Sequence, residues 1–187
     1  MKRKVQIKEG NILLIQLPDL NKNVVGRMCS DSGIQVYDRV YDDSEIDFIN
    51  IDDVVKNNVL LYCLLCTEDL LINKYKLLGN ISLNQLEKDN IPPFFLQDIG
   101  NFRNCSLIFR NGERKKVFPA DCVGLERLVI WDYDGLVERI EDRVIGKKNV
   151  YEETYKVILN EDDIRNTPNP NLLRWDFVKE EFYLWQG

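Results

Sequence analysis

Residues 120–146 read ADCVGLERLVIWDYDGLVERIEDRVIG, and the spacing of their apolar side chains changes partway from that of a strand to that of a helix. The first part, Val123–Trp131, is a short β-prone apolar run bounded by polar residues. Because the run is too short for a helix, it predicts a buried strand. The second part predicts a helix over Tyr133–Ile145.

The predicted helix has one apolar and one charged face. Its apolar stripe consists of Leu136, Val137, Ile140 and Val144. The opposite face, which an amphipathic helix turns away from the core, carries Glu138, Arg139, Asp142 and Arg143. Asp132 or Asp134 can cap the start of the helix, because a carboxylate there accepts hydrogen bonds from free backbone N–H groups. Gly146 supplies the left-handed backbone conformation that ends it.

The N-terminal part of the chain predicts a β-meander, because three alternating apolar segments follow one another with short turns at Pro18–Lys22 and Asp31–Gly33. Its strands are Ile12–Leu17, Val24–Cys29 and Ile34–Val40. The further strands that we expect are Val59–Cys66, Tyr75–Leu78, Cys105–Arg110 and Lys115–Phe118. The last two flank Asn111-Gly112, which is a strong signal for a two-residue turn.

These elements define an α+β fold with a mainly antiparallel, strongly curved sheet, or a small open barrel, packed by one or two helices. The second helix is Ser82–Asn90, where Gln85 follows Ser82 at the capping-box spacing. With 187 residues, of which 44% are hydrophobic, we expect one domain over residues 1–159. Residues 160–187 form a tail whose aromatic side chains are expected to dock on the same domain.

Composition indicates the compartment. No run approaches the roughly 18 apolar residues of a membrane span, and the charged start lacks the apolar region of a signal peptide. The five cysteines, an odd number, lie within or beside apolar runs, so we expect core thiols rather than disulfides. We therefore expect a cytoplasmic protein that does not contact a membrane.

Other patterns argue against catalysis. The chain has no histidine, the residue most often used as a general base and zinc ligand. No glycine-rich phosphate loop is present, and the carboxylates come in runs near turns rather than as isolated pairs. We therefore expect no enzyme and assign no catalytic, cofactor or metal residue. The net charge of −6 disfavours direct binding of nucleic acid.

A binding surface is predicted between the meander and the strand that begins at Val59. This segment, YDDSEIDFINIDDVVKNN, carries six carboxylates against the single cation of Lys56. Charges of one sign attract an oppositely charged partner over long range, and aromatic side chains serve as rigid anchors at interfaces. The candidate binding residues are Tyr41, Asp42, Asp43, Glu45, Asp47, Phe48, Asp52 and Asp53. Alternatively, the segment is a solvated connection whose apolar residues bury in the core.

Three blocks of the sequence resemble the bacterial immunity protein 26 family, in the same order. They are EGNILLIQLPDLNKNVVGRM at residues 9–28, PPFFLQDIGNFRNCSLIF at residues 92–109 and CVGLERLVIWDYDGLVERI at residues 122–140. The resemblance implies an immunity protein that binds and neutralises a cognate polymorphic toxin domain, for example a nuclease, by stoichiometric inhibition. It implies no catalytic site. Nuclease grooves are basic because they hold phosphates, so an acidic segment fits one.

Two other classes of function stay open on sequence alone. One is a carboxylate- and metal-dependent enzyme that acts on a nucleotide or sugar through some of the acidic residues between Asp42 and Asp53. The other is a structural interaction module that forms a homodimer through the C-terminal aromatic residues. We expect a monomer rather than that homodimer.

Overall fold

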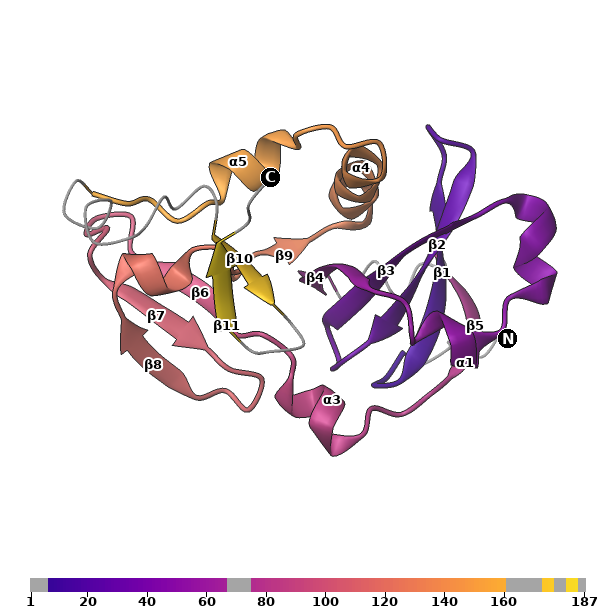
Figure 1. The fold of residues 1–187 in the computed structure, drawn as a ribbon, viewed down its shortest axis with the longest axis horizontal. Coiled ribbons are helices and arrows are strands. Elements are labelled where there is room, and N and C mark those ends of the chain that lie inside the picture. Colours follow the sequence, from indigo (N-terminus) through magenta and orange to yellow (C-terminus); the bar gives the residue numbers. More distant parts are fainter. Residues whose placement is uncertain (1–6, 67–74, 161–172, 177–180, 185–187) are drawn as a thin grey trace. The chain divides into compact units, whose positions relative to one another are not determined.

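The computed structural model of the chain describes residues 7–66, 75–160, 173–176 and 181–184 (Figure 1). The chain divides into two compact units, which are described one at a time. The first comprises residues 1–84 and 129–152, and the second residues 85–128 and 153–187. The extent of one domain over residues 1–159 stays a prediction. The docking of the aromatic tail lies outside the described side chains.

The first unit is built on a six-stranded sheet with the order β5-β1-β2-β3-β4-β9. The strands are β1 (Asn11–Leu17), β2 (Lys22–Met28), β3 (Gly33–Tyr41), β4 (Val59–Leu65), β5 (Lys76–Asn80) and β9 (Ile130–Trp131). All neighbours are antiparallel except β4 and β9, which run parallel. The predicted α+β class and mainly antiparallel sheet are confirmed. The described strands form an open sheet rather than a closed barrel, because β5 and β9 remain as its edges.

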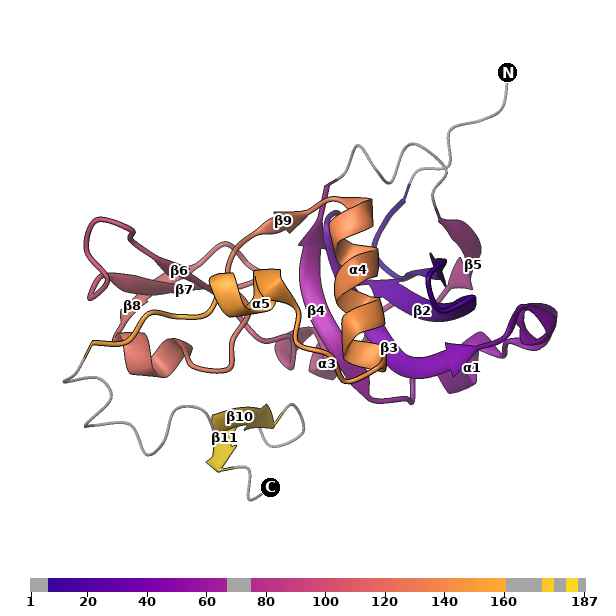
Figure 2. The same ribbon diagram turned by 90° about the horizontal axis from the view of Figure 1, so that it is seen from above.

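Strand β1 is buried on both of its faces. Ile12 and Leu14 join an apolar cluster with Val25 of β2 and Tyr37 of β3. The alternate residues of β1, which point to the other face, are also buried: they are Leu13, Ile15 and Leu17. Helix α4 (Tyr133–Val144) contacts β1, and Figure 2 shows it lying along the sheet. A strand buried in this way needs cover from both sides.

Helix α4 begins and ends where the sequence predicts, to within one residue. The Asp132 side chain accepts a hydrogen bond from the backbone N–H of Gly135 at 2.7 Å, and Gly146 has a φ of +72°. The strand before the helix is much shorter than predicted, because only Ile130–Trp131 pairs with β4. Part of the expected strand instead forms an isolated bridge between Arg127 and Phe95.

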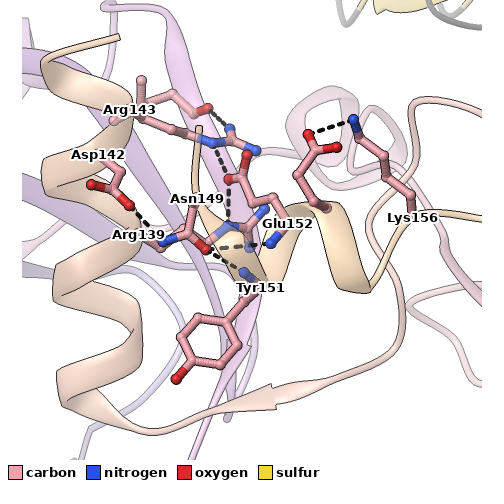
Figure 3. Close-up of polar contacts among 9 residues, drawn as sticks. Arg139, Asp142, Arg143, Asn149, Tyr151, Glu152 and Lys156 are labelled. Carbon is pink, nitrogen blue, oxygen red and sulfur yellow. Dashed lines mark hydrogen bonds and ion pairs between the residues drawn. The ribbon is translucent and has the colours of Figure 1, made fainter. Parts of the chain in front are cut away.

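Half of the predicted polar face of α4 is buried, contrary to the amphipathic pattern: Arg139 and Asp142 are buried, Arg143 is partly exposed and Glu138 is exposed. Arg139 is 2% exposed and Asp142 is 5% exposed. The carboxylate of Glu152, in α5 (Val150–Thr154), accepts hydrogen bonds from Nε of Arg139, at 2.6 Å, and of Arg143 (Figure 3). The guanidinium of Arg139 lies 4.8 Å from the ring centre of Trp131. The two arginines thus share one carboxylate beneath the helix.

Residues that follow α4 complete this network. The side chain of Asn149 donates to Asp142 at 2.9 Å and accepts from the backbone N–H of Tyr151 at 3.0 Å (Figure 3). Lys147 pairs with the Asp142 carboxylate at 2.9 Å. The hydrogen bonds from Lys147 and Asn149 lower the pKa of Asp142. Arg143 also donates to the carbonyl oxygen of Leu60 in β4, which joins the network to the sheet.

The second unit contains a three-stranded antiparallel sheet with the order β6-β7-β8. Its strands are β6 (Phe94–Gln97), β7 (Cys105–Ile108) and β8 (Arg114–Val117). The Asn111-Gly112 turn is confirmed, but the loop has three residues rather than two. The backbone N–H of Phe109 donates to the carbonyl oxygen of Glu113 at 2.9 Å, and that of Gly112 donates to the carbonyl oxygen of Phe109 at 2.9 Å. Gly112 has a φ of +82°.

The buried side chain of Gln97 ties the chain after α5 to this small sheet. Its Oε1 accepts from the N–H of Ile158 at 2.9 Å, and its Nε2 donates to the Ile158 carbonyl at 2.7 Å. Nε2 also donates to the Phe102 carbonyl at 2.8 Å. One side chain therefore makes the pair of backbone hydrogen bonds that a neighbouring strand would make. The backbone of β10 (Leu173–Asp176) pairs with that of β11 (Glu181–Leu184) in a separate hairpin.

Three smaller predictions have mixed outcomes. The helix predicted from Ser82 begins only at Gln85, as α3 (Gln85–Asp89), so Ser82 does not cap it. The five cysteines are free thiols, and all except Cys66 are buried, as predicted. Burial raises the pKa of the Cys122 thiol. In the described part of the chain, no helix has the length and apolar character needed to cross a membrane.

We predict that Glu152→Gln destabilises the first unit in a pH-dependent way. Burial alone would raise the pKa of Glu152, but Arg143 and Arg139 outweigh it, so the pKa is lowered from 4.5. The ionised carboxylate therefore stabilises the fold above pH 4.5, and this contribution is lost as the pH falls through the lowered pKa. Urea unfolding at neutral pH should show a loss of about 2 kcal/mol, below the ~3 to 5 kcal/mol of a fully buried pair.

The matched control is Glu153→Gln, because the neighbouring carboxylate pairs with the exposed Lys156. That variant should change the free energy of unfolding by less than about 0.5 kcal/mol. The difference between wild type and Glu152→Gln should shrink in acid. An effect of Glu152→Gln that is equal at all pH values would contradict the role of the ionised carboxylate.

Candidate functional site: an acidic surface of the first unit

The predicted binding segment folds into two short helices on one side of the six-stranded sheet. They are η1 (Asp43–Phe48), a 3₁₀ helix, and α1 (Ile51–Val54). The apolar residues of the segment that pack against the cluster of Ile12 and Leu14 are Ile46, Ile49, Ile51, Val54 and Val55. The alternative interpretation, that the segment's apolar residues belong to the core, therefore holds for these five side chains but not for Phe48, which is 85% exposed.

Local hydrogen bonds hold both helices in place. The Glu45 carboxylate accepts from the backbone N–H of Asp42 at 2.8 Å, ahead of η1. Asn50 precedes α1 and accepts from the backbone N–H of Asp52 at 3.1 Å. These bonds fix the start of each helix. Because short helices have little stability of their own, the apolar contacts with the sheet must supply the rest.

Two contacts with the start of β2 fix the segment from outside. The buried side chain of Asn23 donates to the Asp43 carboxylate at 2.8 Å, and Lys22 pairs with Asp42. Lys22 and Asn23 lie some twenty residues before the segment in the chain, so the linear pattern does not associate them with it. The antiparallel pairing of β2 with β3, which places Asn23 opposite Tyr41, brings them there.

The surface around this segment carries less net negative charge than the sequence of the segment alone predicts. Lys56 Nζ lies 2.7 Å from Asp53, Lys76 Nζ lies 3.9 Å from Asp47, and Lys22 pairs with Asp42. Three lysines therefore stand among six carboxylates, where the sequence of the segment places only Lys56. The hydrogen bond from Lys56 lowers the pKa of Asp53. All three pairs are exposed to solvent, so each contributes little to stability.

Among the candidate binding residues, the structure separates the two aromatic ones. Tyr41 is 4% exposed and belongs to the core cluster, with the Arg39 guanidinium 4.9 Å from its ring centre. Burial raises the pKa of its hydroxyl. Phe48 projects into solvent at the end of η1. A partner can therefore contact Phe48 directly, whereas the ring of Tyr41 supports the segment from beneath.

The geometry does not assemble a chemical centre from these carboxylates. Across the described residues, no group of three or more histidine, cysteine, aspartate or glutamate side chains is placed to hold a metal ion. The network of Arg139, Arg143 and Glu152 also concentrates charge among the described residues of this unit, and the sequence did not predict it. Its signal was the spacing of Arg139 and Arg143, one helical turn apart, which equally fits an exposed face.

No family model, no curated protein and no solved structure matches this chain. The resemblance to the immunity protein 26 family therefore stays a prediction, supported by the three sequence blocks at residues 9–28, 92–109 and 122–140.

We predict that the two aromatic residues differ sharply in their effect on stability. Phe48→Ala should change the free energy of unfolding by less than about 0.5 kcal/mol, because its ring is exposed. Tyr41→Ala should cost about 3 kcal/mol or more, because it removes a buried ring from the core. Chemical unfolding followed by circular dichroism measures both. A destabilised Phe48→Ala variant would mean that Phe48 packs within the protein.

Proposed function

We propose that this protein is an immunity protein, which binds one toxin domain and blocks it without turnover. The observation that carries the proposal is Phe48, 85% exposed at the end of a helix that hydrogen bonds and apolar contacts hold on the sheet. An exposed aromatic ring on a fixed support binds with little loss of conformational freedom. The three sequence blocks that resemble the immunity protein 26 family support the same role.

Charge defines the complementary surface on the partner. The segment keeps more carboxylates than lysines, so it is attracted to a basic surface, such as the groove in which a nuclease holds phosphates. Asp52 forms no ion pair with another described residue, and Asp47 is separated from Lys76 by 3.9 Å, so both remain available to cations of a partner. In the proposed complex, Phe48 contacts an apolar patch of the toxin domain. The carboxylates of the segment then face basic residues around that patch.

Co-expression tests the role itself. Cells that express the toxin encoded beside this chain should grow when the protein is also present, and the purified pair should form a 1:1 complex by light scattering. Phe48→Ala should weaken the complex by about tenfold or more, as expected for an interface anchor. Equal killing with and without the protein, together with no complex, would contradict the proposal for this pair.

A second prediction concerns the rate of association. Asp47→Lys combined with Asp52→Lys should slow association by about tenfold at low ionic strength, and by much less at high salt. Stopped-flow fluorescence at several salt concentrations measures this. Glu138→Lys is the control, because it makes the same kind of change on an exposed position of α4, outside the segment. If the double variant and the control behave alike, the acidic surface does not steer the partner.

A further inference from the structure

The edge strand β8 of the second unit carries an unusual charge pattern. Arg114, Lys115 and Lys116 are consecutive and exposed, and none of the described carboxylates forms an ion pair with them. Arg110 adds a fourth cation at the turn, and the sequence of the hairpin, residues 105–117, contains one carboxylate, Glu113. This hairpin is locally positive, although the whole chain has a net charge of −6. The described residues leave the outer side of β8 without a neighbouring strand.

The register shows which backbone groups of β8 face outward. The hydrogen bond from Phe109 to Glu113 makes these two residues a hydrogen-bonded pair. Bonded and non-bonded pairs alternate along an antiparallel ladder, so Arg114, opposite Ile108, and Lys116, opposite Ser106, are non-bonded toward β7. Their N–H and C=O groups therefore point away from the sheet, where a further strand can bind them.

We propose that β8 binds an extended acidic segment of a partner protein, which adds to the sheet as a fourth strand. The unpaired backbone groups of Arg114 and Lys116 would provide the hydrogen bonds. Opposite charges directly across two strands stabilise the pairing, whereas like charges oppose it. The selected partner is therefore a segment with consecutive aspartate or glutamate residues. This proposal is independent of the acidic surface of the first unit.

The positions of the cations favour a strand over a nucleic acid. Successive side chains of a strand point to opposite faces, so Lys115 lies on one face and Arg114 and Lys116 on the other. Lys115 shares its face with Val117, which packs against Phe95 and Cys105. A phosphate backbone would meet only one of these faces. An added strand has side chains on both faces of the sheet, so its carboxylates can pair with Lys115 on one face and with Arg114 and Lys116 on the other.

The same charges exclude other occupants. Lysine on an exposed edge discourages indiscriminate strand pairing. The β8 strand of a second copy would bring like charges face to face, and a neutral strand would leave the cations near its backbone without compensation. The cations of β8 thus favour an acidic partner strand over a neutral or a basic one.

Peptide binding to the full-length protein tests the proposal. The probe is a short fluorescent peptide with three consecutive glutamates among valine and threonine. Its two controls are a scrambled peptide that separates the glutamates and a peptide of equal charge with a central proline. In fluorescence polarisation, the probe should bind at least about fivefold more tightly than either control, because proline removes a ladder hydrogen bond and scrambling removes cross-strand pairs.

Variants of the protein locate the site. Lys115→Glu with Lys116→Glu should weaken binding of the probe by about fivefold or more, because two of the three attractive pairs become repulsive. Lys116→Gln should weaken it modestly, and Lys116→Pro should weaken it further, because proline also removes the outward N–H. Circular dichroism verifies that each variant is folded. If the Lys116→Pro variant is not folded, the comparison of the probe with the two control peptides still tests strand addition.

Several results would overturn the proposal. Equal binding of the proline peptide would show attraction by charge alone, without strand addition. Tighter binding of a single-stranded oligonucleotide than of the acidic peptide would identify a nucleic-acid surface instead. No binding of the probe, or binding that the charge-reversed variant retains, would show that the lysines and arginine only protect the edge.

Discussion

The burial of β1 on both faces is the constraint on which the first unit depends. Its residues alternate between two apolar surfaces, and each surface has to be covered. The segment with η1 and α1 packs on the face of Ile12 and Leu14, and α4 contacts the strand from its other side. Because the apolar residues of the acidic segment are needed in the core, its carboxylates and Phe48 are left on the outside. The position of the candidate binding surface thus follows from the packing of the sheet.

Covering the sheet with α4 has a cost, because Arg139 and Asp142 of its polar face are buried as well. An arginine such as Arg139, 2% exposed, is tolerated only when its charge is compensated. Glu152 compensates it, and Arg143 shares the same carboxylate while reaching the carbonyl of Leu60. The helix is therefore fixed by apolar contacts on one side and by directional polar contacts on the other. Directional contacts of this kind select one rotation of the helix on the sheet, whereas apolar contacts tolerate several.

Local patterns in the sequence predicted the elements whose causes are local. The meander followed from alternation and short turns, and α4 followed from its stripe, from Asp132 and from Gly146. The errors lie where a distant residue decides the outcome. The helical spacing predicts an exposed Arg139, but Glu152, thirteen residues later, pairs with it and allows it to be buried. The predicted strand before Trp131 is shorter than expected because Arg127 pairs with Phe95 instead. For the candidate site, the sequence located the acidic segment, but Lys22 and Lys76 reach it only through strand pairing, and Tyr41 faces the core.

Net charge is an incomplete guide to the partners of such a chain. A strand rises about 3.3 Å per residue, so the three cations of β8 span roughly 7 Å, less than the Debye length of about 8 Å at physiological salt. They therefore act on a partner as one positive group. The same holds for the carboxylates of the η1–α1 segment, which their neighbouring lysines only partly offset. A chain with a net charge of −6 can thus present one surface that attracts basic partners and another that attracts acidic ones.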